Sequence, residues 1–125
     1  MTLAHHELCF GCGSANLFGL QMELERDGEG VAGRFFVKQD HQGAAGAHPG
    51  VLASALEEAM ALALHARGVH ARARRLEVVL LGDAPVGVFL ELDARVRDDL
   101  SGEAVARDGD TTVAQARGEF VALPR

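Results

Sequence analysis

The chain has 125 residues, 48% of them hydrophobic, and a formal net charge of -6 at pH 7. One hydrophobic core suits this length, so we expect a single domain spanning residues 1–125. The negative charge argues against nucleic acid as the main partner, because phosphate binding needs a positive field. No apolar run approaches the roughly 20 residues of a membrane span. Two cysteines are too few for a secreted disulfide framework, and no signal-peptide pattern is visible, so we expect a cytoplasmic protein with no membrane partner.

The first 18 residues form an expected loop segment that contains the motif Cys9-x-x-Cys12. Two thiolates at this spacing chelate zinc well, and His5 and His6 lie just upstream. A structural zinc site normally needs four ligands, however, and the chain has no second cysteine pair. The histidines lie in a terminal segment that could be a loop or disordered. We therefore expect no metal, and we interpret the cysteines as a loop-packing motif.

Outside one helix, the sequence predicts strands and turns, and alternating hydrophobicity is the clearest strand signal. The pattern is longest at 88–97, where apolar residues at even positions alternate with mostly polar ones. The pairs Asp27-Gly28 and Asp108-Gly109 are typical of hairpin turns. The complete set of predicted strands is 19–25, 31–37, 75–81, 88–97, 102–107 and 111–122.

One helix is predicted from Gly50 to about Arg67, because apolar residues recur there at helical spacing. Pro49 suits the first helical position and Gly68 suits the stop just past the end. The helix is apolar nearly all round, which predicts burial on most sides. The last strand has a face of small residues that would let this alanine-rich helix approach closely: Ala114, Ala116, Gly118 and Ala122.

The order strand-strand-helix-strand-strand-strand-strand predicts an α+β fold. One long central helix would be wrapped by an antiparallel sheet of five or six strands, which buries both apolar surfaces. A single sheet leaves its edges exposed. Because pairing two sheets edge to edge would cover one edge on each, we expect at least a homodimer.

Three segments in this order resemble the hotdog-fold acyl-CoA thioesterase superfamily, of the phenylacetate-degradation type. They are "CFGCGSANLFGLQM", "HQGAAGAHPGVLASALEEAM" and the strands from "RRLEVVLLGDAPVG" to "DGDTTVAQARGEFVAL", and the likeness runs from residue 9 to 123. The resemblance implies hydrolysis of an acyl-coenzyme A thioester at a subunit interface, in a homodimer or a dimer of dimers. It implies no cofactor besides the coenzyme A of the substrate. Because this fold also hosts dehydratases and proteins with no known activity, fold alone does not decide function.

The resemblance also implies the roles of residues around the helix. In the family a His-Gly-Gly triplet opens the helix, the N–H after the histidine binds the thioester oxygen, and a carboxylate nine residues after the histidine activates water or attacks. Here the triplet is His48-Pro49-Gly50 and the carboxylate is Glu57. A helix N-terminus offers donors to an oxyanion, and a glutamate in apolar surroundings is a better base than a solvated one. Glu58 points about 100° away, so we expect it to meet solvent or an arginine.

The chain departs from the family pattern at two positions. Pro49 has no N–H, so the oxyanion donor would have to be Gly50 N–H, with the substrate shifted by one residue. Ala73 stands where members often have a threonine or serine that positions water. Both departures favour the alternative of a non-catalytic acyl-thioester or small-ligand binding protein. A hydratase is a weaker option, because the paired Asp and His of that chemistry are not visible.

The remaining candidates are expected to bind substrate rather than react with it. Gln42 and Gly43 precede His48 on a loop that would line the same site. Arg72, Arg74 and Arg75 suit the phosphates of coenzyme A, although solvated surface charge explains such a cluster equally well. We expect His48 itself to act mainly through its position at the start of the helix. A small or aromatic acyl group is expected, and nothing in the sequence fixes its length.

Overall fold

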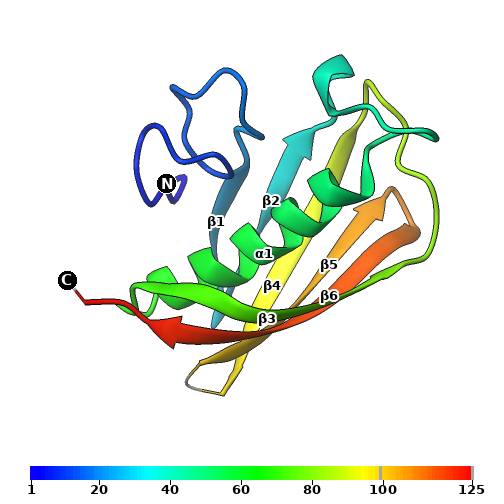
Figure 1. Cartoon of the computed structure of the whole chain (residues 1–125). Helices are drawn as coiled ribbons and strands as arrows, with labels where there is room; N and C mark the ends of the chain where they lie inside the picture. The colour runs from blue at the N-terminus through cyan, green and yellow to red at the C-terminus, as the bar shows by residue number, and fades with distance from the viewer. Residues whose placement is uncertain (99, 125) are drawn as a thin grey trace.

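The computed structural model describes residues 1–98 and 100–124. In chain order the elements are β1 (Glu23–Asp27), β2 (Gly30–Phe36), a 3-10 turn (Gln39–His41), α1 (Pro49–His65), β3 (Ala71–Leu80), β4 (Phe89–Asp98), β5 (Ser101–Asp108) and β6 (Thr111–Ala122). The strands form one antiparallel six-stranded sheet in the order β1-β2-β4-β5-β6-β3. Helix α1 lies across one face of this sheet (Figure 1). The predicted α+β hotdog fold is confirmed.

Helix α1 begins and ends where the local sequence signals predict, within two residues. Pro49 occupies the first helical position. His48 is the N-cap residue, and its side chain accepts a hydrogen bond from Gly50 N–H. Gly68, just beyond the helix, adopts the left-handed region at φ 82° that favours glycine. Ten of the helical residues are buried, which confirms the expectation of a helix covered on most sides.

Small residues on β5 and β6 let the helix approach the sheet closely. A Cβ atom at Gly118 would lie 3.2 Å from Met60 Cε, and one at Gly102 would lie 3.4 Å from Met60 Cγ. Met60 fills this space with a flexible thioether chain and is itself buried. The predicted small face of β6 therefore does contact the helix, although Phe120, rather than Ala122, is its buried residue near the end.

The predicted alternation on β4 is confirmed, with Leu90, Leu92 and Ala94 buried against the helix. Both predicted hairpin turns form, with glycines at φ 60°. The first strand differs from the prediction, because it begins at Glu23 rather than at residue 19. Residues 19–22 hydrogen-bond instead to the N-terminal loop, where Leu20 and Met22 N–H donate to the carbonyls of Phe10 and Gly11.

The two edges of the sheet differ in how they are covered. On β1 the backbone N–H of Leu3 donates to the Leu24 carbonyl at 2.8 Å, so the N-terminal segment pairs with part of that edge. At the other edge β3 carries exposed apolar side chains, among them Leu76, Val79 and Leu80. In the described residues no helix combines the length and the apolar character needed to cross a membrane.

Candidate functional site

Glu57 lies in the middle of α1 and lines a groove of about 300 Å³. The groove runs between the helix, the N-terminal loop and β3. Its other lining residues are Cys9, Phe10, Gly11, Ala53, Ser54, Glu58 and Leu76. One wall therefore comes from a segment that lies far from α1 in sequence, and the prediction did not include that segment in the site.

The surroundings of Glu57 favour the protonated form of its carboxyl group. Burial raises the pKa of Glu57 above its usual value, the negative charge of Glu58 raises it further, and His5 and the backbone of Ala73 partly offset this. The raised pKa makes Glu57 a stronger base than a solvated glutamate. The backbone of Ala73, an expected site residue, is one of the groups that lower the pKa of Glu57.

Ser54 is a groove residue that the sequence did not single out. It precedes Glu57 by less than one turn of α1, so the two side chains project from neighbouring positions on one helix face. Its hydroxyl donates to the carbonyl of Gly50 at 2.8 Å, which leaves the oxygen able to accept a hydrogen bond. Nothing in a serine within an apolar helix distinguishes it from a structural one until the groove is seen.

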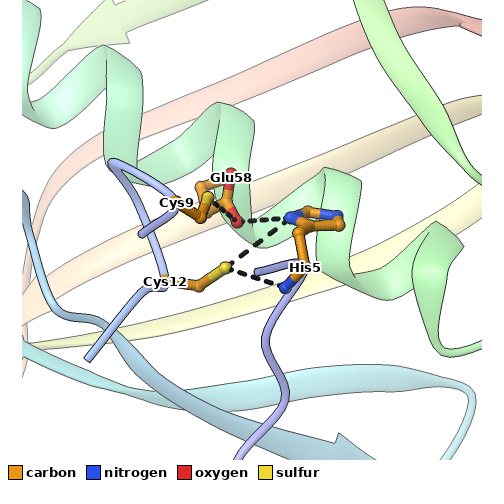
Figure 2. A group of neighbouring side chains, drawn as sticks. All are labelled: His5, Cys9, Cys12 and Glu58. Atoms are coloured by element: carbon orange, nitrogen blue, oxygen red, sulfur yellow. Dashed lines mark hydrogen bonds and ion pairs between the residues drawn. The ribbon is translucent and has the colours of Figure 1, made fainter. Parts of the chain in front are cut away.

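Glu58 has a different environment from the one predicted. Instead of meeting solvent or an arginine, it is 7% exposed, and its Oε2 lies 2.8 Å from Nδ1 of His5. His5 was expected in a loop or disordered segment, yet its side chain packs beside α1 (Figure 2). Glu58 is buried because the N-terminal loop folds back onto the helix and brings His5 as a partner for the carboxylate.

Cys9 and Cys12 complete a four-residue cluster with His5 and Glu58, shown in Figure 2. One potential ligand atom of each residue lies within 4.8 Å of those of the other three. Cys9 Sγ is 3.5 Å from Glu58 Oε2, and Cys12 Sγ is 3.6 Å from His5 Nδ1. Hydrogen bonds to Cys12 and then to Glu58 raise the pKa of His5 to about 11, while burial raises the pKa of the Cys12 thiol.

Two glycines allow close packing of the cysteine loop, Gly11 against the helix and Gly13 within the loop itself. A Cβ atom at Gly11 would lie 2.4 Å from Glu58 Cγ, so only glycine permits this approach. A Cβ atom at Gly13 would lie 2.4 Å from the carbonyl oxygen of Glu7, and Gly13 N–H donates to the Cys9 carbonyl at 2.8 Å. The sequence showed the Cys-x-x-Cys motif, but it did not show which helix residue the motif would meet.

The N-terminus of α1 offers fewer free donors than an oxyanion site requires. Pro49 has no N–H, and Gly50 N–H donates to His48 Nδ1 at 2.8 Å. The next two N–H groups, of Val51 and Leu52, donate to the His48 carbonyl. Use of Gly50 N–H by a substrate would therefore require the His48 ring to turn away.

The expected lining residues Gln42 and Gly43 do lie beside His48. Gln42 pairs with Ala47 in an isolated bridge, and a Cβ atom at Gly43 would lie 2.8 Å from His48 Cα. This group is remote from Glu57 within one chain. Nine residues of α-helix, at 1.5 Å each, separate His48 from Glu57 by about 13 Å along the axis.

The arginine cluster is not brought to the groove within one chain. Arg75 is paired with Glu119 across the β3–β6 ladder. Arg74 lies at a bulge in β3, where the register of the two strands shifts. Arg74 forms an ion pair with Glu119 at 2.6 Å, and Arg72 is exposed. Because Gly118 and Phe120 face the helix, alternation puts Glu119 and its partners on the outer face of the sheet.

His41 is a buried histidine that no sequence motif marks. Its Nδ1 accepts from Lys38 N–H at 3.1 Å, and its carbonyl accepts from His48 N–H at 2.7 Å. Burial lowers the pKa of the His41 side chain below its usual value. His41 thus holds the turn that leads into α1 and enters the site only by positioning His48.

No family model and no curated protein matches the chain, but many solved structures resemble it. The E. coli PaaI protein from the phenylacetic acid degradation operon is 24% identical, with a TM-score of 0.71 over 84% of this chain and 81% of that one. The chain shares the hotdog fold of this protein and of other solved structures that are described as thioesterase superfamily proteins. Conserved protein PA5202 from Pseudomonas aeruginosa is 21% identical, with a TM-score of 0.71 over 83% of this chain and 90% of that one. An aspartate-to-alanine variant of a hypothetical thioesterase from Streptococcus pneumoniae is 14% identical, with a TM-score of 0.75 over 83% of this chain and 92% of that one.

Proposed function

We propose that this chain is an acyl-CoA thioesterase in which Glu57 is the general base or the nucleophile. The observation that carries the proposal is the position of Glu57. Its carboxylate, with a raised pKa, lines a groove between the central helix and β3 of a thioesterase-superfamily fold. The groove, of about 300 Å³, suits a small or aromatic acyl group. A cytoplasmic location remains a prediction from the sequence.

Two variants of the Streptococcus pneumoniae protein support the assignment of positions 57 and 73 to one site. One replaces an aspartate by alanine and the other a threonine by alanine. The two substituted positions are separated along that chain by as many residues as Glu57 and Ala73 are here. This chain has alanine at the second position, so a hydroxyl that positions water would come from Ser54 instead, from the other side of Glu57.

The proposed site needs two chains. Glu57 and the N-terminus of its own helix lie about 13 Å apart along the axis, which is too far for both to contact one carbonyl group. A second copy could bring its His48-Pro49-Gly50 segment to the groove. The β3 edge, with its exposed apolar residues, supports edge-to-edge pairing of two sheets in a homodimer.

In the general-base form of the reaction, the Glu57 carboxylate takes a proton from water as the water oxygen bonds to the thioester carbon. The resulting oxyanion is stabilised by donors at the N-terminus of the second copy's helix, where Gly50 N–H becomes free once the His48 ring turns away. Collapse of this intermediate breaks the carbon–sulfur bond. The departing coenzyme A thiolate takes the proton from the Glu57 carboxyl group, which restores the carboxylate.

A non-catalytic binding protein is the second candidate. The hydrogen bond from Gly50 N–H to His48 Nδ1 favours it, because this bond occupies the donor that hydrolysis would need. A binding protein would hold an acyl-CoA or its thioether analogue without releasing thiol. A gain of hydrolysis in Pro49→Gly would show that the missing N–H had blocked the reaction.

Thiol release from a panel of acetyl-, benzoyl-, phenylacetyl- and medium-chain acyl-CoA substrates tests the two candidates. We expect turnover by the wild type and a loss of about 10² to 10⁴-fold in kcat/KM for Glu57→Gln. The matched control is Glu29→Gln, an exposed glutamate in the β1–β2 turn. Equal rates in Glu57→Gln and wild type would reject the role of Glu57. Calorimetric binding of the thioether analogue without any turnover would support the second candidate.

A further inference from the structure

The cluster of His5, Cys9, Cys12 and Glu58 gathers four metal-binding side chains from two distant segments of the chain. Three come from the N-terminal loop and one comes from the middle of α1. All four potential ligand atoms lie within 4.8 Å of one another, and Figure 2 shows the side chains converging on one point. The proposed thioesterase reaction uses none of these four groups.

Two ligand–ligand distances in the cluster match those around a tetrahedral ion. Zinc bonds of about 2.3 Å to sulfur and about 2.0 Å to nitrogen or oxygen give ligand–ligand edges of roughly 3.3 to 3.8 Å. The Cys9 Sγ to Glu58 Oε2 edge is 3.5 Å and the Cys12 Sγ to His5 Nδ1 edge is 3.6 Å. A third edge, 2.8 Å between His5 Nδ1 and Glu58 Oε2, would open by about half an ångström, and the other three edges are no longer than 4.8 Å.

The environment of the cluster also suits a cation. Cys12 and Glu58 are buried, and among the described residues His5 is the only ion-pair partner of Glu58. The backbone N–H of His5 donates to Cys12 Sγ at 3.2 Å, a contact that favours a thiolate. Gly11 provides the close approach that places both sulfur atoms over the helix.

We propose that these four residues bind one Zn²⁺ ion as a structural site. Two thiolates with one imidazole and one carboxylate are a donor set that zinc accepts, whereas iron–sulfur clusters take sulfur ligands almost throughout. On binding, each thiol releases its proton to solvent, and the protonated His5 ring releases its Nδ1 proton as well, so that a neutral Nδ1 ligates the ion. The protein fills all four positions, so the ion has no open site for water or substrate.

The consequence of such a site is the attachment of the N-terminal loop to α1. Residues 5–12 contain no helix or strand of their own, so a metal that binds only the folded arrangement would stabilise it. Because Cys9 and Glu58 also line the Glu57 groove, the zinc would fix one wall of that groove. The inference does not depend on thioesterase activity, since the site would be present in a binding protein as well.

The first test is metal analysis of the full chain, purified without a metal-chelating tag from zinc-supplemented cells. We expect about one zinc per chain in the wild type and loss of most of it in Cys12→Ser and Glu58→Gln. Two matched controls should retain the metal. Glu57→Gln changes the adjacent carboxylate of the same helix, and His6→Asn changes the neighbouring histidine, whose Nδ1 accepts from Leu8 N–H.

The second test uses the wild type alone, so that it does not depend on the folding of a variant. After chelation under reducing conditions, the chain is titrated with Co²⁺ and followed by absorption spectroscopy. We expect saturation at one equivalent, with the intense visible bands of a tetrahedral ion and the near-ultraviolet bands of thiolate ligation. Addition of Zn²⁺ should abolish these bands and raise the Tm of the chelated protein.

Three results would overturn the proposal. A freshly purified chain containing no zinc and taking up no Co²⁺ would exclude the site. Zinc retained in both Cys12→Ser and Glu58→Gln would place the metal elsewhere. An intact mass showing a Cys9–Cys12 disulfide in the wild type would show that the cysteines form a redox pair instead.

Discussion

The carboxylate of Glu58 lies 2.8 Å from Nδ1 of His5, although 53 residues separate the two in the sequence. This contact ties the N-terminal loop to the central helix. Glu57, one residue earlier, lines the groove that carries the proposed chemistry. The adjacent glutamates therefore have different surroundings, because a helix turns about 100° between them and each meets a different neighbour.

The two glutamates should differ in their effect on stability. Glu58→Ala removes the partner of His5 inside the structure, and we expect the free energy of unfolding to fall by about 3 kcal/mol. Glu57→Ala should change it by less than about 1 kcal/mol, since Glu57 gains no comparable partner and is disfavoured by the charge of Glu58. Urea denaturation, with and without a chelator, measures the unfolding free energies of both variants. Equal losses in the two variants would contradict the separate roles.

Gly11 should be intolerant of even a methyl group. In Gly11→Ala the new Cβ would lie 2.4 Å from Glu58 Cγ, so the loop has to move away from α1. We expect a loss of about 1 to 3 kcal/mol in unfolding free energy, together with reduced Co²⁺ uptake. Gly82→Ala is the matched control, because nothing lies within 4 Å of a Cβ atom there. Unchanged Co²⁺ uptake in Gly11→Ala would show that the loop does not need this approach.

Local patterns predicted the fold well, and contacts between distant segments explain what they missed. The alternation at 88–97 and the helical spacing after Pro49 both depend on near neighbours, so β4 and α1 appear almost where they were expected. Residues 19–22 look like a strand by composition, but the N–H groups of Gly19, Leu20 and Met22 pair with the N-terminal loop. The Cys-x-x-Cys motif was visible in the sequence. Its helix-borne neighbour was not, because no periodicity relates position 12 to position 58.

The hydrogen bond from Gly50 N–H to His48 Nδ1 should make His48 a helix cap. In His48→Ala the free energy of unfolding should fall by about 1 kcal/mol, the usual effect of losing an N-cap. His48→Asn supplies a different acceptor at the same position and should recover most of the loss. Thermal unfolding followed by circular dichroism compares the three proteins. A His48→Asn protein as unstable as His48→Ala would show that the ring acts through packing rather than through its nitrogen.

His41 should make the protein less stable in mild acid. Burial is the main cause of its lowered pKa, Lys38 lowers it further, and the Gly19 backbone and Asp40 oppose the shift. The unfolded chain takes up a proton near the ordinary value of 6.5, whereas the folded chain does so only at lower pH. The free energy of unfolding is therefore fully maintained above that value and falls as pH drops from 6.5 towards the folded pKa.

The variant His41→Asn tests this pH dependence. Its amide oxygen can accept from Lys38 N–H in place of Nδ1, but it does not titrate. Urea denaturation between about pH 7.5 and about pH 5.5 should show a flatter dependence for His41→Asn than for the wild type. The same slope in both proteins would assign the pH dependence to other groups.

The proposed division of the active site between two chains predicts complementation between inactive variants. Glu57→Gln removes the base, and Gly50→Asp places a negative charge where the oxyanion would form, at a helix position that tolerates a carboxylate. Co-expressed chains that pair at random make half of the dimers mixed, and one site of each mixed dimer has neither substitution. About a quarter of the wild-type thiol-release rate should therefore return. Physically mixing the two purified proteins without subunit exchange provides the control and should restore no activity. If co-expression also restores none, Glu57 and Gly50 do not act together across an interface, and the oxyanion donor has to be found within the groove of a single chain.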